Sequence, residues 1–354
     1  MVHRLLLATS AALLAALIAF GGSPVAGQPL AHDAPSPVVL PEAEGPHLAP
    51  IEWWYFAAHL STTTGEQYGL YFTVFQWRRG GLVAHIAHLA VTDPVRGSHV
   101  FEERRVLGGG AARPAAAGAF DFNLGGWTLT GQPGAYQLTA DLDGYRFSLS
   151  FRDEAALVLH GDDGYVDYGG GLGSYYFSRP RMAAVGEMSR DGGTAAVRGE
   201  AWLDRQWGEF TTHLDGGWDW FALQLDDGSS LILYRLLAPD GSSERLDGTL
   251  VRPDGSVVSL DADQVSTEAT GAWTSPATQV TYPSGWRIAA PAEGADLELV
   301  PILAQQEIDA RASTGLIYWE GQVSITGTRS GRPVGGMGYV ELTGYAGHSA
   351  PVSP

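Results

Sequence analysis

Hydrophobic and polar residues alternate along much of this chain. Between residues 136 and 142 every second side chain is apolar, and the same alternation returns between residues 145 and 151. A period of two is typical of β-strands that bury one face. Asp143-Gly144 separates the two runs, and this dipeptide between alternating segments is a strong signal for a tight hairpin. The pattern therefore predicts an antiparallel pair of strands.

Turn signals of the same kind divide the rest of the chain into short runs, and no long amphipathic helix interrupts them. Closely spaced strands with regular turns are typical of a sandwich or an up-and-down barrel, so we expect an all-β, antiparallel fold. The supporting turns are Asp227-Gly228, Asp240-Gly241, Asp254-Gly255, Ser330-Gly331 between segments 317–327 and 335–345, and residues 63–66 between segments 51–60 and 67–77.

The N-terminal residues have a different character. Arg4 precedes an apolar run over residues 5–20, and small residues follow it, which is typical of a secretory signal peptide spanning residues 1–27. An uncleaved anchor helix is the alternative, although the run is short for a membrane span, which needs about 20 residues. Residues 28–47 are rich in Pro, Ala and His, and we interpret them as a linker without regular structure.

The rest of the chain is long enough for two domains. Gly208 and Gly216-Gly217 bracket a polar stretch before a new series of hairpins, so we place the domains at 48–210 and 215–346, with a tail at 347–354. No second apolar run of membrane length follows the first. We therefore expect an exported protein, periplasmic or secreted, without stable membrane insertion after the signal is removed.

Composition narrows the classes of partner and leaves the oligomeric state open. The chain carries 39 acidic and 21 basic residues, a formal net charge of −18. This balance argues against nucleic acid and anionic lipid, because both bind basic surfaces. The chain has no cysteine, so its stability depends on a packed core and not on disulfides. Eleven tryptophans favour a small apolar ligand in an aromatic-lined pocket.

The motifs of common hydrolases are absent from the sequence. It has no G-x-S-x-G elbow, no H-E-x-x-H zinc pair, no phosphate-binding loop and no cysteine nucleophile. His85 and His88 are three residues apart, which puts them on opposite faces of a strand, so they cannot bind one metal as a pair. We expect neither a metal nor another cofactor, and His88 is a candidate base in the pocket.

Candidate binding residues begin in the first predicted strand. Alternation puts Glu52, Trp54 and Phe56 on one face and Trp53 and Tyr55 on the other. One aromatic face can form the core while the other lines a cavity, and we assign Glu52 and Trp54 to substrate binding. Core packing, with a buried ion pair for Glu52, is the alternative.

A second aromatic strand over residues 174–180 supplies more candidates. Tyr175 and Phe177 are assigned to substrate binding, and Tyr176 to catalysis because its phenol can donate a hydrogen bond. The second half of the chain opens with Trp218, Trp220 and Gln224 on one face, and these are assigned to substrate binding as well. A purely structural role is the alternative for each of them.

Residues 202–208 hold the strongest candidate for chemistry. Trp202 and Asp204 share a face, and an acid beside an indole in a medium of low dielectric has its charged form disfavoured. The pKa of Asp204 should therefore rise, which makes it a candidate general acid near neutral pH. Trp202 and Trp207 are assigned to substrate binding. An ion pair between Asp204 and an arginine of a neighbouring strand is the alternative.

Several aromatic motifs in fixed order resemble the AttH-like family, which includes carotenoid 1,2-hydratase, also called hydroxyneurosporene synthase. Together they extend over nearly all of the chain that follows the predicted linker. The motifs are residues 52–56, 175–178, 202–208, 218–221 and 318–321.

This resemblance implies two lipocalin-like β-barrel or sandwich domains packed side by side, with a ligand site at or near their interface. Family members are described as carotenoid hydratases, related hydratases, pericyclase-like enzymes or predicted secreted hydrolases, and the signal peptide places this chain with the secreted branch. In the hydratases the acid in the stretch ending in Trp-Gly is the proposed proton donor, which corresponds to Asp204. Trp202 and Arg205 stand where the hydratases have Tyr and His, and Tyr175-x-Phe177 where they have His-x-Trp.

Three functions are compatible with these residues. The first is a hydratase, in which protonated Asp204 donates to an alkene, aromatic faces of Trp202, Trp54 or Tyr176 stabilise the carbocation, and His88 or the Asp204 carboxylate takes the proton of the added water. The second is a carrier that only binds an apolar ligand. The third is a surface module that stacks its indoles on glycans.

Overall fold

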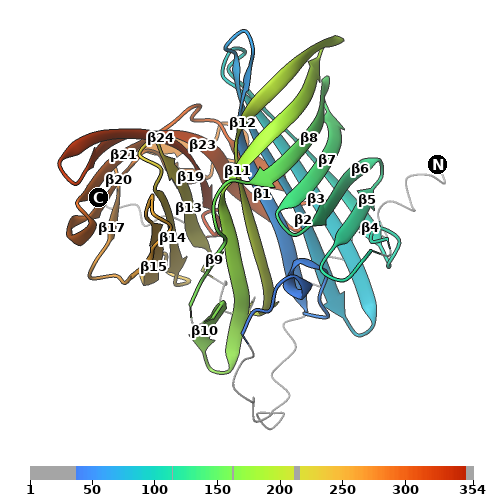
Figure 1. The fold of residues 1–354 in the computed structure, drawn as a ribbon, viewed down its shortest axis with the longest axis horizontal. Helices are drawn as coiled ribbons and strands as arrows, with labels where there is room; N and C mark the ends of the chain where they lie inside the picture. Colours follow the sequence, from blue (N-terminus) through green and yellow to red (C-terminus); the bar gives the residue numbers. More distant parts are fainter. Residues whose placement is uncertain (1–36, 114, 162, 211–215, 348–354) are drawn as a thin grey trace.

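The structure, a computed structural model, describes residues 37–113, 115–161, 163–210 and 216–347. Within these ranges the chain forms 24 β-strands and two short 3-10 turns, arranged as two curved sheets that lie side by side (Figure 1). The predicted all-β fold with two adjacent β-domains is confirmed. The predicted signal peptide lies outside the described residues.

The first sheet has the spatial order β4-β3-β2-β1-β12-β11-β8-β7-β6-β5, and β9 and β10 pair with β11. Its pairings are antiparallel. The strands are β1 (Ile51–Thr62), β2 (Gln67–Arg79), β3 (Leu82–Asp93), β4 (Ser98–Leu107), β5 (Phe120–Leu124), β6 (Trp127–Gln132), β7 (Ala135–Leu142), β8 (Tyr145–Asp153), β9 (Val158–Leu159), β10 (Tyr165–Gly169), β11 (Leu172–Arg190) and β12 (Gly193–Glu209).

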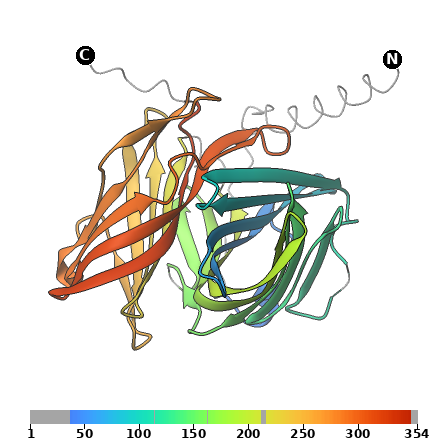
Figure 2. The same ribbon diagram turned by 90° about the horizontal axis from the view of Figure 1, so that it is seen from above.

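The two edges of this sheet approach each other and nearly close it into a barrel (Figure 2). Arg104 of β4 lies over the ring of Trp127 in β6, with 4.1 Å between the guanidinium carbon and the ring centre. The same guanidinium donates to the carbonyl of Gly125 at 2.5 Å. These contacts cover sheet edges that would otherwise offer unpaired backbone groups to other chains.

The interior of the barrel is filled with side chains. Trp54, Phe56 and Ala58 alternate along β1 and are buried there with Phe122 and Trp127 from the opposite wall. Trp54 and Phe122 pack edge to face, with 4.6 Å between ring centres. Because the inner face of β1 is used for core packing of this density, the outer face is the one that meets the second sheet.

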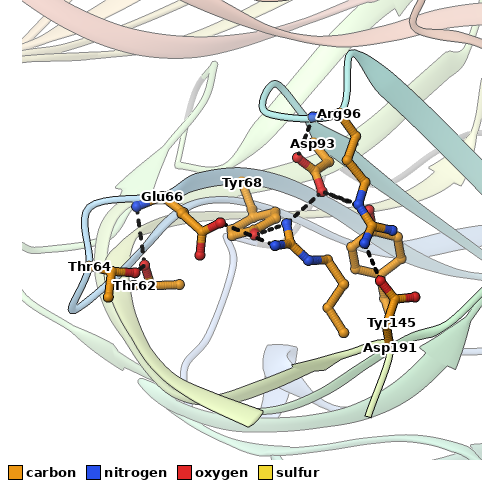
Figure 3. A network of polar contacts seen from close by, with 9 residues as sticks. Thr62, Thr64, Glu66, Tyr68, Asp93, Arg96, Tyr145 and Asp191 are labelled. Atoms are coloured by element: carbon orange, nitrogen blue, oxygen red, sulfur yellow. Dashed lines mark hydrogen bonds and ion pairs between the residues drawn. The ribbon is translucent and has the colours of Figure 1, made fainter. Parts of the chain in front are cut away.

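A network of polar side chains links the hairpins at one end of the barrel (Figure 3). Arg190 donates to Tyr68, to Asp93 at 3.0 Å and to Glu66 at 3.1 Å, and Tyr145 also donates to Asp93, at 2.8 Å. The groups come from separate strands and turns, so the network holds opposite walls together. Asp93 is buried, and the arginine compensates its charge.

The second sheet has the spatial order β16-β15-β14-β13-β24-β23-β21-β20-β17, with β22 paired to β23, and β18 and β19 form a separate two-stranded sheet. Its core contains Trp286, Trp319 and Phe221. The strands are β13 (Trp218–Leu225), β14 (Ser230–Leu237), β15 (Ser243–Val251), β16 (Val257–Leu260), β17 (Ser266–Ala269), β18 (Ala272–Thr274), β19 (Thr281–Pro283), β20 (Trp286–Ala290), β21 (Ala295–Pro301), β22 (Glu307–Ala310), β23 (Leu316–Arg329) and β24 (Arg332–Leu342).

The hairpin turns behave as the sequence predicts. Asp143 and Gly144 have φ values of 40° and 83°, and the strands on either side pair directly up to the turn. Ser330 and Gly331, with φ values of 51° and 75°, join β23 and β24 in the same way. Two consecutive residues with positive φ match the twist of adjacent strands, which explains the choice of Asp-Gly and Ser-Gly.

Part of the segment predicted as a linker is packed against the barrel, although residues such as Val39 remain exposed. It contains the 3-10 turn η1 (Glu42–Glu44), whose last residue forms a buried ion pair with Arg179. The ring of His47 stacks on Trp207, with 4.0 Å between ring centres. Over residues 37–47 the only regular element is η1, and its buried acid and the ring of His47 attach this stretch to the barrel.

The outer face of β1, β11 and β12 packs against the second sheet. Tyr55 donates to Glu320 at 2.8 Å, and Trp220 donates to the hydroxyl of Tyr176 at 3.0 Å. Further hydrogen bonds join the sheets along the same interface, so the domains are held by polar as well as apolar contacts. These pairs are Tyr71–Tyr318, His88–Tyr318, His88–Ser313, Thr92–Gln306, His160–Thr249 and Gln322–His59.

Candidate active site at the domain interface

Three neighbouring strands place Asp204 in the middle of this interface. In β12 it lies opposite Tyr55 of β1 on one side and opposite Ser178 of β11 on the other. Trp202 precedes it by two residues and shares its face, while Leu203 points into the barrel core. The period of two along β12 therefore selects which side chains meet the second domain.

The carboxylate of Asp204 accepts hydrogen bonds from three neutral donors. Ser178 Oγ donates at 2.5 Å, Trp202 Nε1 donates at 2.6 Å, and the Tyr176 hydroxyl donates as well. Trp220 Nε1, from the second sheet, donates in turn to the Tyr176 hydroxyl at 3.0 Å. The structure thus brings together four of the residues that the sequence predicts: Asp204, Tyr176, Trp202 and Trp220.

Burial controls the charge of this acid. It raises the pKa of Asp204 to about 6, and the hydrogen bonds from Ser178, Tyr176 and Trp202 offset only part of that effect. Among the ion pairs of the described residues, none involves Asp204; Arg205, the adjacent cation, pairs with Glu52 at 2.6 Å. The alternative of an ion pair at Asp204 is therefore wrong.

The second sheet contributes another acid to the same region. Glu341 of β24 lies opposite Trp220 in the strand register and accepts a hydrogen bond from Trp218 Nε1 at 3.2 Å. Burial raises the pKa of Glu341 to about 7, the Trp218 hydrogen bond lowers it, and the nearby charge of Asp204 raises it. Two carboxyl groups with raised pKa values thus lie on opposite walls of the interface.

A third buried acid continues the row on the second sheet. Glu320 lies opposite Glu341 in the register of β23 and β24, and one of its oxygens accepts from Tyr55 while the other has no hydrogen-bond partner. Burial raises the pKa of Glu320 well above its ordinary value, and the charge of Glu341 raises it further. Both effects favour the protonated, neutral form of this acid.

The aromatic side chains around Asp204 are in contact with one another. Trp202 and Trp220 pack edge to face with ring centres 6.2 Å apart, and Tyr55 packs against Trp220 at 4.9 Å. The exposed fractions are 3% for Asp204, 4% for Tyr176 and 2% for Trp202. A substrate can reach the acid only when these side chains, or the two sheets, move apart.

His88 lies in a different cluster of the interface. Its Nδ1 is 2.7 Å from the Tyr318 hydroxyl and its Nε2 is 2.9 Å from Ser313 Oγ, and neither partner contacts Asp204. Ser313 donates its single hydrogen to Glu103, so His88 Nε2 must carry a hydrogen and donate to Ser313. The structure therefore does not place His88 as a base beside Asp204, nor as a base that activates Ser313.

Three predicted binding residues, Trp54, Phe177 and Glu52, lie on the inner side of the first sheet. Trp54 belongs to the barrel core, and Phe177 packs with residues near η1. Glu52 is fully buried in an ion pair with Arg205; burial raises its pKa, but Arg205 and His47 outweigh this and the net pKa is lowered. Their assignment to the same site as Asp204 is wrong, because the sheet separates them from it.

Tyr175 and Trp207 are on that inner side as well. Their rings stack at 5.3 Å, and Trp207 is covered by His47 on the packed N-terminal segment. These two residues anchor the segment and do not line the site of Asp204. Gln224 is on the interface but ties the two domains together, donating to the carbonyls of Pro180 at 2.8 Å and Ala201 at 3.1 Å.

Three residues of this region were not predicted from the sequence as site residues: Ser178, Glu341 and His160. Ser178 could have been found, because it follows Tyr176 by two residues and must share its face. Glu341 alternates with Tyr339 along β24, but nothing local indicates which sheet face meets the other domain. His160 follows the two-residue strand β9, and no sequence pattern distinguishes it.

Within the described residues, no group of three or more His, Cys, Asp or Glu side chains is arranged to hold a metal ion. The same residues contain no helix that is long and apolar enough to cross a membrane.

The comparisons with known proteins cover most of this chain. The model of the AttH-like family matches residues 31–345. The crystal structure of a protein assigned as an AttH (NE1406) from Nitrosomonas europaea is similar, with a TM-score of 0.79 and 32% identity over 88% of this chain and 98% of that one. A search of curated proteins finds no significant match.

Two more distant structures share the fold. Kievitone hydratase from Nectria haematococca aligns with a TM-score of 0.68 and 19% identity over 87% of this chain and 93% of that one. CghA, solved with Sch210972, aligns with a TM-score of 0.53 and 13% identity over 84% of this chain and 90% of that one. From the match over residues 31–345, this chain belongs to the AttH-like family.

Proposed function

We propose that this protein is an exported hydratase that binds an apolar, isoprenoid- or lipid-like alkene at the domain interface and adds water to its C=C bond by acid catalysis. The observation that carries the proposal is the environment of Asp204. It is a buried carboxyl group whose partners are neutral donors, surrounded by indole and phenol rings. A structurally similar protein, kievitone hydratase, is a hydratase by name, which supports the same class of reaction.

The first step needs a proton donor inside an apolar site. A carboxyl group with a pKa of about 6 is partly protonated near neutral pH and strong enough to donate, which suits general acid catalysis. Asp204 gives its proton to one alkene carbon, and positive charge develops on the other. The aromatic rings of Trp202, Trp220 and Tyr176 line this region, and cation–π interaction with a ring face would stabilise that charge.

The second step adds water to the carbocation. The oxygen forms a bond to the cationic carbon, and the water must then lose one proton to a base. Glu341 is the carboxyl group on the opposite wall, and the charge of Asp204 influences its pKa, so it replaces His88 as the expected base. The pKa values of about 6 and about 7 predict a bell-shaped dependence of rate on pH, highest between pH 6 and 7.

Other functions fit the structure less well. Seven of the eleven tryptophans are buried and the other four are half-buried, so they offer no stacking surface to a glycan. A carrier would use the same apolar interface, but it would gain nothing from an acid held without a counter-charge. Desolvation of such an acid costs stability, and a catalytic role explains why the cost is tolerated.

Mass spectrometry of small molecules extracted from the purified protein tests this proposal. An apolar alkene found together with its product, heavier by one molecule of water, is the expected result for the wild type. Asp204→Asn, purified in parallel, should retain the alkene and lack the product. An alkene recovered without any hydrated form from both proteins would indicate a carrier and contradict the hydratase.

A further inference from the structure

A chain of side chains leads from Asp204 across the interface and is not part of the reaction described above. Ser178 Oγ donates to Asp204 at 2.5 Å and lies 2.8 Å from His160 Nε2. The other ring nitrogen, His160 Nδ1, lies 3.1 Å from Thr249 Oγ1 of β15 in the second sheet. All four residues are buried, with exposed fractions of 0% for Ser178 and 2% for His160.

The directions of these hydrogen bonds follow from the number of hydrogens available. A carboxylate only accepts, and a serine hydroxyl has one hydrogen, so with ionised Asp204 that hydrogen must point from Ser178 to the acid. His160 Nε2 must then carry a hydrogen and donate to Ser178. His160 Nδ1 carries none and accepts from Thr249. Each donor in the chain points towards Asp204.

Protonation of Asp204 reverses the whole chain. The acid then donates to Ser178 Oγ, Ser178 donates to His160 Nε2, and His160 Nδ1–H donates to Thr249. The Tyr176 hydroxyl accepts from Trp220 and donates to ionised Asp204, and Ser178 is the neighbour of the acid that continues the chain to His160. The imidazole is neutral in both states, in agreement with burial, which lowers the pKa of His160 to about 3.

The far end of the chain, Thr249, is buried with 7% of its surface exposed, and a surface hollow lies near it along β15. Val158 and Val251, two residues from His160 and Thr249 respectively, line a surface hollow of about 270 Å³ between the two domains. Thr249 and Val251 are two residues apart in β15 and share a face, so the outer end of the chain points to the side of β15 on which Val251 lines the hollow. The inner end is the acid, which the surrounding aromatic rings close off from water.

We infer that Thr249, His160 and Ser178 form a proton relay that reloads Asp204 from water in the interdomain hollow. The inference rests on the proposed function, in which Asp204 gives a proton to the substrate in each turnover and Glu341 takes one from water. In reloading, Ser178 passes its hydrogen to Asp204, His160 passes the Nε2 hydrogen to Ser178, Thr249 passes its hydrogen to Nδ1, and water supplies Thr249. One proton enters through the relay and each relay residue ends neutral, while Glu341 releases to solvent the proton that it took from the added water, so no net charge accumulates.

The tautomer of His160 in the resting protein tests the relay without a substrate. Protein labelled with ¹⁵N-histidine is titrated, and two-bond ¹H–¹⁵N spectra distinguish Nε2–H, Nδ1–H and imidazolium. We expect Nε2–H above pH 7 and Nδ1–H below pH 5, with the change centred where Asp204 titrates, at about 6. A single tautomer across the range, or an imidazolium, would overturn the relay. The titratable groups on the surfaces that face the chain include Tyr176, Tyr55, Glu341 and Asp247, which shares a face of β15 with Thr249, and the two tyrosines remain neutral over this range.

Two serine variants separate the relay from general effects of pH. Ser178→Ala breaks the link to Asp204, so His160 should stop following pH. Ser313→Ala removes the equivalent hydroxyl at His88 and should leave the behaviour of His160 unchanged. If Ser178→Ala does not fold, Thr249→Val serves instead, because it removes the acceptor of Nδ1–H and should hold His160 as Nε2–H. A switch that persists at the wild-type midpoint in either relay variant would contradict the inference.

The outcome also distinguishes the relay from the reaction. An intact tautomer switch in a protein that hydrates no alkene would overturn the proposed function and leave the chain as a device that adjusts the charge of Asp204. Hydration by a protein whose His160 never changes tautomer would overturn the relay and leave the function standing.

Discussion

Replacing Asp204 with Asn should change how stability depends on pH. The carboxyl has a pKa of about 6 in the folded protein and an ordinary pKa of about 3.9 in the unfolded chain. Between these values the folded state binds more protons than the unfolded state, so the free energy of unfolding falls as pH rises and levels off above pH 6. An acid held by an arginine, with a lowered pKa, would show the opposite slope.

The size of the effect follows from the same two values. A separation of about two pH units corresponds to about 3 kcal/mol, at about 1.36 kcal/mol per unit, and about 2 kcal/mol of it falls between pH 4 and pH 8. The amide side chain of the variant cannot ionise, so the variant does not show this fall in the free energy of unfolding. Any constant cost of fitting an amide beside Ser178 and Tyr176 is present at both pH values and cancels in the comparison.

Guanidinium chloride unfolding of wild type and Asp204→Asn at pH 4 and pH 8 measures this difference. The variant should gain about 2 kcal/mol relative to wild type on going from the lower to the higher pH. Asp296→Asn is the matched control, because the hydrogen bond and charge of Arg287 lower the pKa of this exposed acid, and its shift should have the opposite sign. If Asp204→Asn instead lost stability relative to wild type between pH 4 and pH 8, the pKa of Asp204 could not be raised by desolvation.

Three further substitutions test other parts of the structure. Tyr176→Phe removes a hydrogen-bond donor to Asp204 and should raise the pKa of that acid by up to about one unit. The pKa can be followed by ¹³C NMR of labelled aspartate, and an unchanged pKa would show that the hydrogen bond is weak. His88→Ala should lower the free energy of unfolding by about 2–4 kcal/mol at pH 8. This loss should shrink towards pH 5, because burial lowers the pKa of folded His88 to about 3, whereas the unfolded chain takes up its proton at a pH of about 6.5. A loss that grows towards pH 5 would contradict a neutral buried ring. Glu52→Gln leaves Arg205 buried without its counter-charge and should cost about 3–5 kcal/mol in a denaturant titration, whereas a loss under about 1 kcal/mol would mean that water reaches the pair.

The strands and hairpins of this fold can be predicted from short segments of the sequence. Alternation and Asp-Gly turns are short-range signals, and antiparallel hairpins follow from them directly. The same alternation correctly groups Trp202 with Asp204 and separates Trp54 from Tyr55. It cannot say which face of a strand becomes core, and so Trp54 and Phe177 were assigned to the site although they lie inside the barrel.

Contacts between the two domains could not be predicted from the sequence. Trp220 meets Tyr176, and His160 meets Thr249, only because the two sheets dock in one particular register. That register depends on the combined shape of both surfaces and leaves no periodic trace in the chain. Glu341 was overlooked for the same reason, since an acid in an alternating strand is ordinarily a solvent-facing residue.

Deuterium transfer tests the central claim most directly. Wild type and Asp204→Asn are incubated in D₂O with a panel of isoprenoid and unsaturated lipid alkenes, with Asp296→Asn as the control, and the products are examined by mass spectrometry and NMR. We predict that the wild type and the control form an alcohol that carries one deuterium on carbon, delivered by Asp204, and that Asp204→Asn forms none. Hydration at the wild-type rate by Asp204→Asn would show that another group donates the proton and would contradict the proposed mechanism.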